Sequence, residues 1–344
     1  MTNIPSSKPI HTSRHSAFFS SFQVKDCWDE MGSAIQRGLQ NTIMKCTRSG
    51  TRERKRAYYR HSNPAGNLFS LCLGGCEVGR LVFVVQLVEF LCIIDDVLED
   101  LPHGEALVEH DILCEAVHNH NEPEISMTTP FTENTRPEWI SFLREIKQEM
   151  MELDPVRSPA LFLTFEQSLR SRDSSVVDFD TLEEYLPYRL LNFDYEFVSQ
   201  LLLWAMNIDL TPEETSSPVL QDFKHSIGII VGLVNDYFSW EMEKVQLEQS
   251  DRVRNAVAVV MKERRIPERK AKAEVKKVIL REEVKVKLTM ALLHGTGQRS
   301  YSEALGRYLD ELEVFAGGYS YWCATCPRYS RPQSDSDETS DDSD

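Results

Sequence analysis

The sequence lacks the features that mark several classes of protein. No run of eighteen apolar residues is free of charge, which argues against a transmembrane helix. Residues 1–21 are polar, with proline, serine and histidine, so they lack the apolar core of a signal peptide. Lys and Arg number 38 against 54 Asp and Glu, and the net charge of -16 argues against nucleic acid as a partner. We therefore expect a cytoplasmic protein.

The eight cysteines form no regular disulfide framework. Cys323 and Cys326 make a C-x-x-C, but no second pair with zinc spacing lies near them. We expect reduced thiols, as in a cytosolic protein, without a metal or redox role for this pair.

Length and patterning predict one helical domain. A chain of 344 residues could form two domains, but the helical pattern continues without a clear linker until Arg331. We expect a flexible N-terminal arm over residues 1–25, one all-α domain over residues 26–331, and a disordered acidic tail over residues 332–344.

An apolar segment from Leu81 to Leu101 ends in four carboxylates. Neither Gly nor Pro interrupts it, and it is apolar nearly all round, which predicts a buried helix. Close anions in a poorly solvated place repel one another unless a cation sits among them. Oxygen ligands of this kind suit Mg²⁺. The alternative is a solvated acidic helix end, although acids there oppose the helix dipole. The carboxylates are Asp95, Asp96, Glu99 and Asp100.

A second set of oxygen ligands recurs at every fourth residue. Asn235, Ser239 and Glu243 would form one stripe on a helix, rising about 6 Å and drifting about 40° per step. An amide, a hydroxyl and a carboxylate in a row make another site for a hard cation. The alternative is a polar helix face on which the serine bonds its own helix.

Together the two stretches resemble the paired metal motifs of class I terpene cyclases. Arg189 lies 46 residues before Asn235, where that family carries its diphosphate-sensing arginine, and Asn192 follows three later. Near the end, Arg328 and Tyr329 match the family's Arg-Tyr pair. The resemblance spans roughly residues 66–329 and is strongest to the cyclase half of fungal bifunctional terpene synthases, which join a cyclase to a prenyltransferase.

The resemblance implies a single-domain helical bundle of the class I terpene synthase type with a central apolar cavity. It implies a lyase that ionises a C20 or C25 prenyl diphosphate, cyclises the allyl cation and releases diphosphate, with three Mg²⁺ ions. The metal ligands would be Asp95, Asp96, Glu99, Asn235, Ser239 and Glu243, with Asp100 in support. The diphosphate would contact Arg189, Asn192, Asn235, Ser239, Glu243, Arg328 and Tyr329. The residues that carry catalysis would be Asp95, Arg189, Arg328 and Tyr329.

Several points stay open at this stage. Arg189 could instead pair with a structural carboxylate such as Asp194 or Glu196. The basic run over residues 48–60 reads as a solvated face, or as a source of one arginine that turns toward the diphosphate. Many relatives carry a lysine just before the final Glu of the second motif, but here that residue is Met242, with Lys244 one place beyond the Glu. The aromatic candidates for the cavity wall are Phe69, Phe90, Tyr188 and Trp322.

Two other functions remain as alternatives. A trans-prenyltransferase would carry a second Asp-Asp-x-x-Asp, which this chain lacks. A non-catalytic helical scaffold would use the acidic tail or the basic strip over residues 262–287 for partners, and that strip could also contact another subunit of a homo-oligomer. The chain is either a stand-alone cyclase or the cyclase portion of a longer protein with a prenyltransferase domain.

Overall fold

The computed structural model of the chain describes residues 7–118, 132, 134–171, 178–246, 254–295 and 301–329. Within these residues the chain is helical apart from two short antiparallel strands, which confirms the all-α prediction. None of the described helices combines the length and the apolar content needed to cross a membrane. The predicted acidic tail at 332–344 lies outside the described residues.

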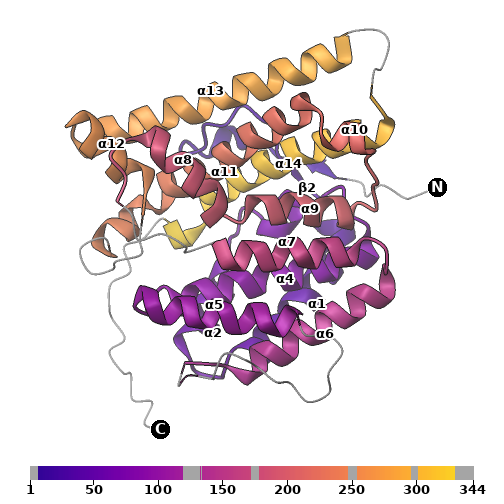
Figure 1. Cartoon of the computed structure of the whole chain (residues 1–344). Coiled ribbons are helices and arrows are strands. Elements are labelled where there is room, and N and C mark those ends of the chain that lie inside the picture. The colour runs from indigo at the N-terminus through magenta and orange to yellow at the C-terminus, as the bar shows by residue number, and fades with distance from the viewer. Residues whose placement is uncertain are drawn as a thin grey trace.

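The elements follow one another along the chain, and Figure 1 labels most of them. They are β1 (Lys8–Pro9), η1 (Thr12–Arg14), β2 (Lys25–Asp26), α1 (Trp28–Cys46), α2 (Arg52–Arg60), α3 (Leu68–Cys72), α4 (Val78–Leu98), α5 (His103–His118), α6 (Pro137–Leu153), α7 (Ser158–Ser171), α8 (Leu182–Asn192), α9 (Tyr195–Ala205), α10 (Pro212–Thr215), α11 (Pro218–Gln246), α12 (Ala256–Arg264), α13 (Glu268–Gly295), α14 (Glu303–Thr325) and η2 (Pro327–Tyr329).

Local signals set several helix boundaries. The Thr181 hydroxyl accepts the N–H of Glu184 at 3.2 Å and caps α8. Between α12 and α13, Arg265 adopts the left-handed conformation with φ 52°, and Pro267 follows it. A proline cannot continue the hydrogen-bond ladder, so the basic strip over residues 262–287 is divided there between α12 and α13.

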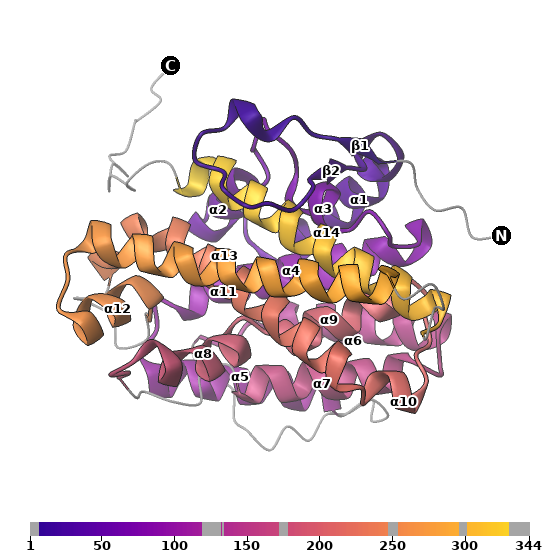
Figure 2. The same cartoon turned by 90° about the horizontal axis from the view of Figure 1, so that it is seen from above.

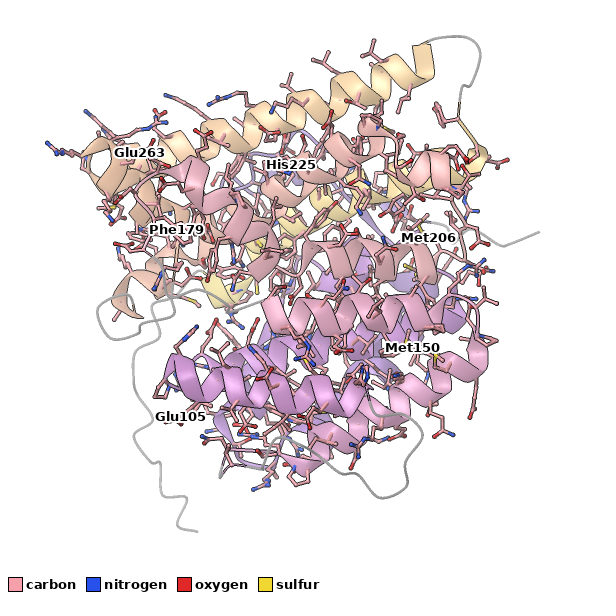
Figure 3. The ribbon with its side chains drawn as sticks, viewed as in Figure 1. Glu105, Met150, Phe179, Met206, His225 and Glu263 are labelled. Atoms are coloured by element: carbon pink, nitrogen blue, oxygen red, sulfur yellow. The ribbon has the colours of Figure 1, made fainter. Side chains whose placement is uncertain are left out.

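Two long helices organise the packing. α4 packs against α1, and α11 packs against α13 and α14. Figure 2 shows α13 running along the width of the molecule on its outer side. Side chains fill the space between helices in Figure 3, where the labelled Met150 and Met206 are both buried. All eight cysteines are free thiols, as expected.

The expectation of a loose N-terminal arm is wrong for residues 7–25. β1 pairs antiparallel with β2, and Phe22 and Val24 are buried in the core. The backbone N–H of Ser21 donates to the Glu283 carboxylate of α13 at 2.9 Å. The apolar residues at the end of this polar segment pack against the helices, and their burial holds the segment in place. The overall composition of the segment did not reveal this.

α14 meets the N-terminal half of the chain at two glycines. A Cβ atom at Gly318 would lie 1.9 Å from the carbonyl oxygen of Leu71 in α3, and one at Gly317 would lie 2.7 Å from that of Gln23. Only glycine allows this approach, because any side chain would overlap the neighbouring backbone. The spacing between α14 and α3 is therefore set by backbone contact.

Candidate active site

A cavity of about 260 Å³ lies among α3, α4, α8, α9, α11, α14 and η2. Much of its lining is apolar or aromatic, including Leu68, Val88, Leu201, Leu202 and Phe315. The charged and hydrogen-bonding side chains that line it include Arg60, Asp95, Glu99, Tyr188, Arg189, Asn192, Asp194, Asn235, Ser239, Glu243, Arg254, Tyr319, Trp322, Arg328 and Tyr329. Both predicted oxygen-rich helix segments therefore reach one cavity.

The end of α4 presents two of its four carboxylates to the cavity. Asp95 and Glu99 both line it and are one helical turn apart. Glu99 is exposed where it lines the cavity. Desolvation by the surrounding protein, and then repulsion from Asp95, raises the pKa of Glu99 to about 8. Glu243 on α11 adds to this repulsion, so the acids of the two motifs are close enough to interact.

Asp96 points away from Asp95 and is held by arginines. It is buried and forms an ion pair with Arg60, and Arg328 donates to its second oxygen at 3.3 Å. Arg56 lies 3.9 Å from the same second oxygen. Burial favours the neutral acid, but Arg60 and Arg328 outweigh it and lower the pKa of Asp96. Asp96 is therefore an ionised, buried carboxylate that arginine side chains hold in place.

Asp100 lies farther from the cavity. It pairs with the exposed Arg52 at 3.1 Å and is absent from the lining. Asp100 is therefore a charged surface residue of the same motif that does not line the cavity.

Hydrogen bonds to the charged Arg189 and to neutral side chains organise the α11 stripe. The Asn235 side-chain oxygen accepts from Arg189 at 2.7 Å, and its amide nitrogen donates to Tyr319 at 3.1 Å and Tyr329 at 3.0 Å. At the other end of the stripe, Glu243 accepts from Asn255 at 2.9 Å. Burial and the nearby Asp236 raise the pKa of Glu243. Ser239 lies between these two residues and also lines the cavity.

Arg189 connects α8 to this stripe. It is largely buried, donates to Asn192 at 2.6 Å, and lies 3.0 Å from the Asp236 carboxylate. Burial alone would lower the pKa of Arg189, but Asp236 raises it, so the guanidinium is charged. The structural carboxylate beside it is thus Asp236. Asp194 accepts from Ser168, and Glu196 accepts from Gln200 and pairs with Lys224 at 2.9 Å.

The Arg-Tyr pair in η2 links the two motifs. Arg328 donates to Asp96 near the end of α4, while the Tyr329 hydroxyl accepts from Asn235 on α11. Tyr329 also packs edge-on against Trp322, with ring centroids 5.8 Å apart. One turn of chain therefore contacts both predicted ligand sets.

Two arginines of the cavity were not singled out from the sequence. Arg60 is almost fully buried, pairs with Glu89 at 3.1 Å as well as with Asp96, and faces the cavity. The sequence feature that could have identified Arg60 is its spacing from Arg56. The two arginines are four residues apart and so share one helix face within the basic run. Arg254 precedes α12 and lines the cavity, and no pattern in the sequence marked it.

Three of the four aromatic candidates line the cavity, namely Phe69, Tyr188 and Trp322. The prediction for Phe90 is wrong. Its ring lies 6.0 Å from that of Trp139 and 5.4 Å from that of Phe142, inside the core between α4 and α6.

Lys244 does not take the place of the missing lysine at Met242. Its ammonium pairs with Glu241 at 2.6 Å and with Glu268 of α13 at 3.5 Å. Met242 lines the cavity, whereas Lys244 is absent from the lining.

Comparison with known proteins agrees with this geometry. Residues 86–285 match the family described as terpene synthase family 2, C-terminal metal binding. Sesterterpene synthase btcA from Colletotrichum orbiculare is 28% identical over 280 residues, which cover 78% of this chain and 37% of that protein. Bifunctional terpene synthase FUP1 from Fusarium proliferatum is 28% identical over 283 residues, covering 81% and 36%. The chain thus spans less than half the length of these relatives.

The fold matches solved structures as well. Aristolochene synthase from Penicillium roqueforti superposes with a TM-score of 0.63 at 17% identity, covering 84% of this chain and 94% of that one. The family match extends over more than half of the chain and includes both cavity-lining motifs. The chain is therefore a member of terpene synthase family 2, with the all-α fold of class I terpene synthases.

Proposed function

We propose that this chain is a Mg²⁺-dependent terpene cyclase that ionises a linear C20 or C25 prenyl diphosphate, cyclises the allyl cation and releases diphosphate. One observation carries the proposal. A single cavity gathers the acids of α4, the Asn–Ser–Glu stripe of α11 and several arginines, while the rest of its lining is largely apolar and aromatic. A diphosphate group and a hydrocarbon chain need these two environments side by side.

The donor set fits Mg²⁺. Carboxylate, amide and hydroxyl oxygens are hard ligands. Desolvation first, and then repulsion from neighbouring carboxylates, raises the pKa of Glu99 and of Glu243, and a bound cation would offset both effects. We assign direct ligation to Asp95, Asn235 and Glu243, with Glu99 and Ser239 completing the two sets and Asp96 in support. When bound, Mg²⁺ supplies Lewis-acid stabilisation of the charge that develops on the leaving diphosphate. The resemblance to class I cyclases implies three ions.

We assign diphosphate binding to Arg189, Arg328 and Tyr329, with Asn192 orienting Arg189. Both guanidinium groups are charged and can bond phosphate oxygens with two N–H groups at once. Each is also held by a buried carboxylate, Asp236 or Asp96. They are thereby pre-positioned for charge on the leaving group, which is where electrostatic catalysis gains most.

An aromatic wall on α14 suits the carbocation. Phe315, Tyr319 and Trp322 all line the cavity and stack in sequence, with ring centroids 6.2 Å and 6.1 Å apart. Aromatic faces attract positive charge without acting as nucleophiles. The wall reaches the Arg-Tyr pair at Tyr329, so it starts beside the diphosphate groups.

The names of the relatives bear on substrate and context. One is called a sesterterpene synthase and another a bifunctional terpene synthase. We therefore favour a C25 or C20 substrate over C15. We also propose that a prenyltransferase domain accompanies this cyclase in a longer parent chain.

The test is incubation of the purified chain with C15, C20 and C25 prenyl diphosphates and Mg²⁺, followed by hydrocarbon analysis and diphosphate detection. We expect cyclic hydrocarbons from C20 or C25, and none after metal chelation. The matched control is Asp100→Asn, which removes a carboxylate of the same motif that does not line the cavity. Linear elongated diphosphates formed with added isopentenyl diphosphate would instead identify a prenyltransferase. No turnover of any substrate would favour the helical scaffold.

A further inference from the structure

The proposed chemistry leaves the outer face of α13 unexplained. This helix lies at one edge of the molecule, and Figure 3 shows side chains pointing outward along it. At 100° per residue, the part of one face that runs from residue 277 to residue 292 is about 80° wide and carries two basic residues followed by three apolar ones. They are Lys277, Arg281, Val284, Leu288 and Leu292.

The three apolar residues, here called the apolar stripe, are not used by the fold. Val284 is 55% exposed, Leu288 59% and Leu292 70%. α13 packs on the rest of the chain through its opposite face, where Val275 and Ile279 are fully buried. A single exposed leucine is ordinary, whereas aligned exposed apolar residues beside polar ones mark an interaction surface.

The charge around the apolar stripe is positive although the chain is acidic. α13 carries eight Lys and Arg against four Glu, in a chain of net charge -16. On the outer face the acid is Glu274, which pairs with Lys277 at 2.6 Å and Arg264 at 2.6 Å. Glu282 and Glu283 are buried. The surface that a partner meets along this face is therefore basic at one end and apolar at the other.

We propose that this face of α13 docks on an anionic membrane surface, with the apolar stripe entering the headgroup region and the basic end facing lipid phosphates. Helices that lie in a membrane interface combine an apolar stripe with Lys and Arg in this way. Charges more than about 8 Å away are screened at physiological salt, so the acidic remainder of the chain does not cancel the local attraction.

A second protein copy fits this face less well. The apolar stripe runs from Val284 to Leu292, about 12 Å along the helix axis at 1.5 Å per residue. Stable protein interfaces bury about 800 Å² on each partner, and the apolar stripe is too narrow to supply that area. Two basic ends would also meet if copies paired in parallel. The docking proposal rests on these surface features and not on the catalytic assignment.

The test is co-sedimentation of the purified chain with vesicles of phosphatidylcholine and phosphatidylserine at about 7:3. The variant Leu288→Glu/Leu292→Glu should lower the bound fraction about tenfold or more, since it replaces two inserting side chains with charges. The matched control is Val156→Glu/Leu163→Glu, which adds the same charges at residues that are 83% and 57% exposed elsewhere. The control should bind like the unmodified chain, and added NaCl should weaken binding of both.

Three outcomes would overturn the proposal. The unmodified chain does not sediment with the anionic vesicles, or the α13 variant sediments as well as the control, or light scattering shows a dimer that the α13 variant alone dissociates. Thermal unfolding checks that both variants fold. If the α13 variant is unfolded, Leu288→Ser/Leu292→Ser serves in its place and the same three outcomes apply.

Discussion

The two oxygen-rich segments of the cavity are built in opposite ways. At the end of α4 the groups are carboxylates, and desolvation together with repulsion from Asp95 raises the pKa of Glu99 to about 8. On α11 the leading group is a neutral amide, fixed by Arg189 and two tyrosine hydroxyls. One segment has excess charge and the other has fixed geometry. We infer that α4 provides most of the attraction for cations and that α11 provides their placement.

The largest effect should come from removing charge at α4. Asp95→Asn should lower turnover roughly 100-fold or more, because several kcal/mol of metal-dependent stabilisation would be lost. The measurement is product formation as a function of Mg²⁺ concentration, with Asp100→Asn beside it. Equal activity of the two variants would show that the cavity-facing position has no special role.

Asp96→Asn should act differently from Asp95→Asn, although the two residues are neighbours. It loosens Arg328 and removes one partner of the buried Arg60, so we expect lower thermal stability and a KM for the prenyl diphosphate roughly tenfold higher. The Mg²⁺ dependence should change much less than in Asp95→Asn. A variant that loses metal affinity and keeps its stability would make Asp96 a ligand instead of an anchor.

Placement by α11 should be tested by removing one hydroxyl. Tyr329→Phe deletes one of the two acceptors of the Asn235 amide and leaves Tyr319 in place. The loss of one hydrogen bond, about 1 kcal/mol, predicts roughly a fivefold rise in the Mg²⁺ concentration for half-maximal activity. Tyr319→Phe is the reciprocal variant. If neither substitution affects the Mg²⁺ dependence, the tyrosines do not position Asn235.

The smallest effect concerns pH and the stability of the metal-free chain. The folded-state pKa of Glu99 is raised from 4.5 to about 8, so its contribution to stability is fully present below pH 4.5 and is lost as pH rises through 8. Glu99→Gln removes this loss. In the presence of a chelator, thermal unfolding midpoints should favour the variant more at pH 9 than at pH 5. An equal difference at both pH values would contradict the raised pKa.

Helical periodicity alone could have predicted which residues of α4 face the cavity and which do not. Val84, Val88, Leu91, Asp95 and Glu99 fall on one stripe at intervals of three and four, and all of them line the cavity. Asp96 is rotated by 100° from Asp95 and Phe90 by about 140°. Their burial against arginines and against the core therefore follows from the same rule that places Asp95.

Other parts of the site depend on contacts that no local pattern specifies. The carboxylate of Asp236 on α11 reaches Arg189 on α8, while Glu196, which is closer in the sequence, pairs with Lys224. Arg254 and the inward turn of Arg60 likewise follow from how helices pack. Burial of Phe22 and Val24 holds the N-terminal segment in place, and that burial depends on contacts with the rest of the chain.

The glycine contact behind the cavity has a consequence for the proposed cyclisation. Gly318 faces α3 and does not line the cavity, yet α3 and α14 both supply cavity walls through Phe69 and Trp322. A methyl group at this position would force the two helices apart or tilt them, and the cavity would change shape. In the proposed reaction, a residue outside the cavity lining would therefore influence which rings close.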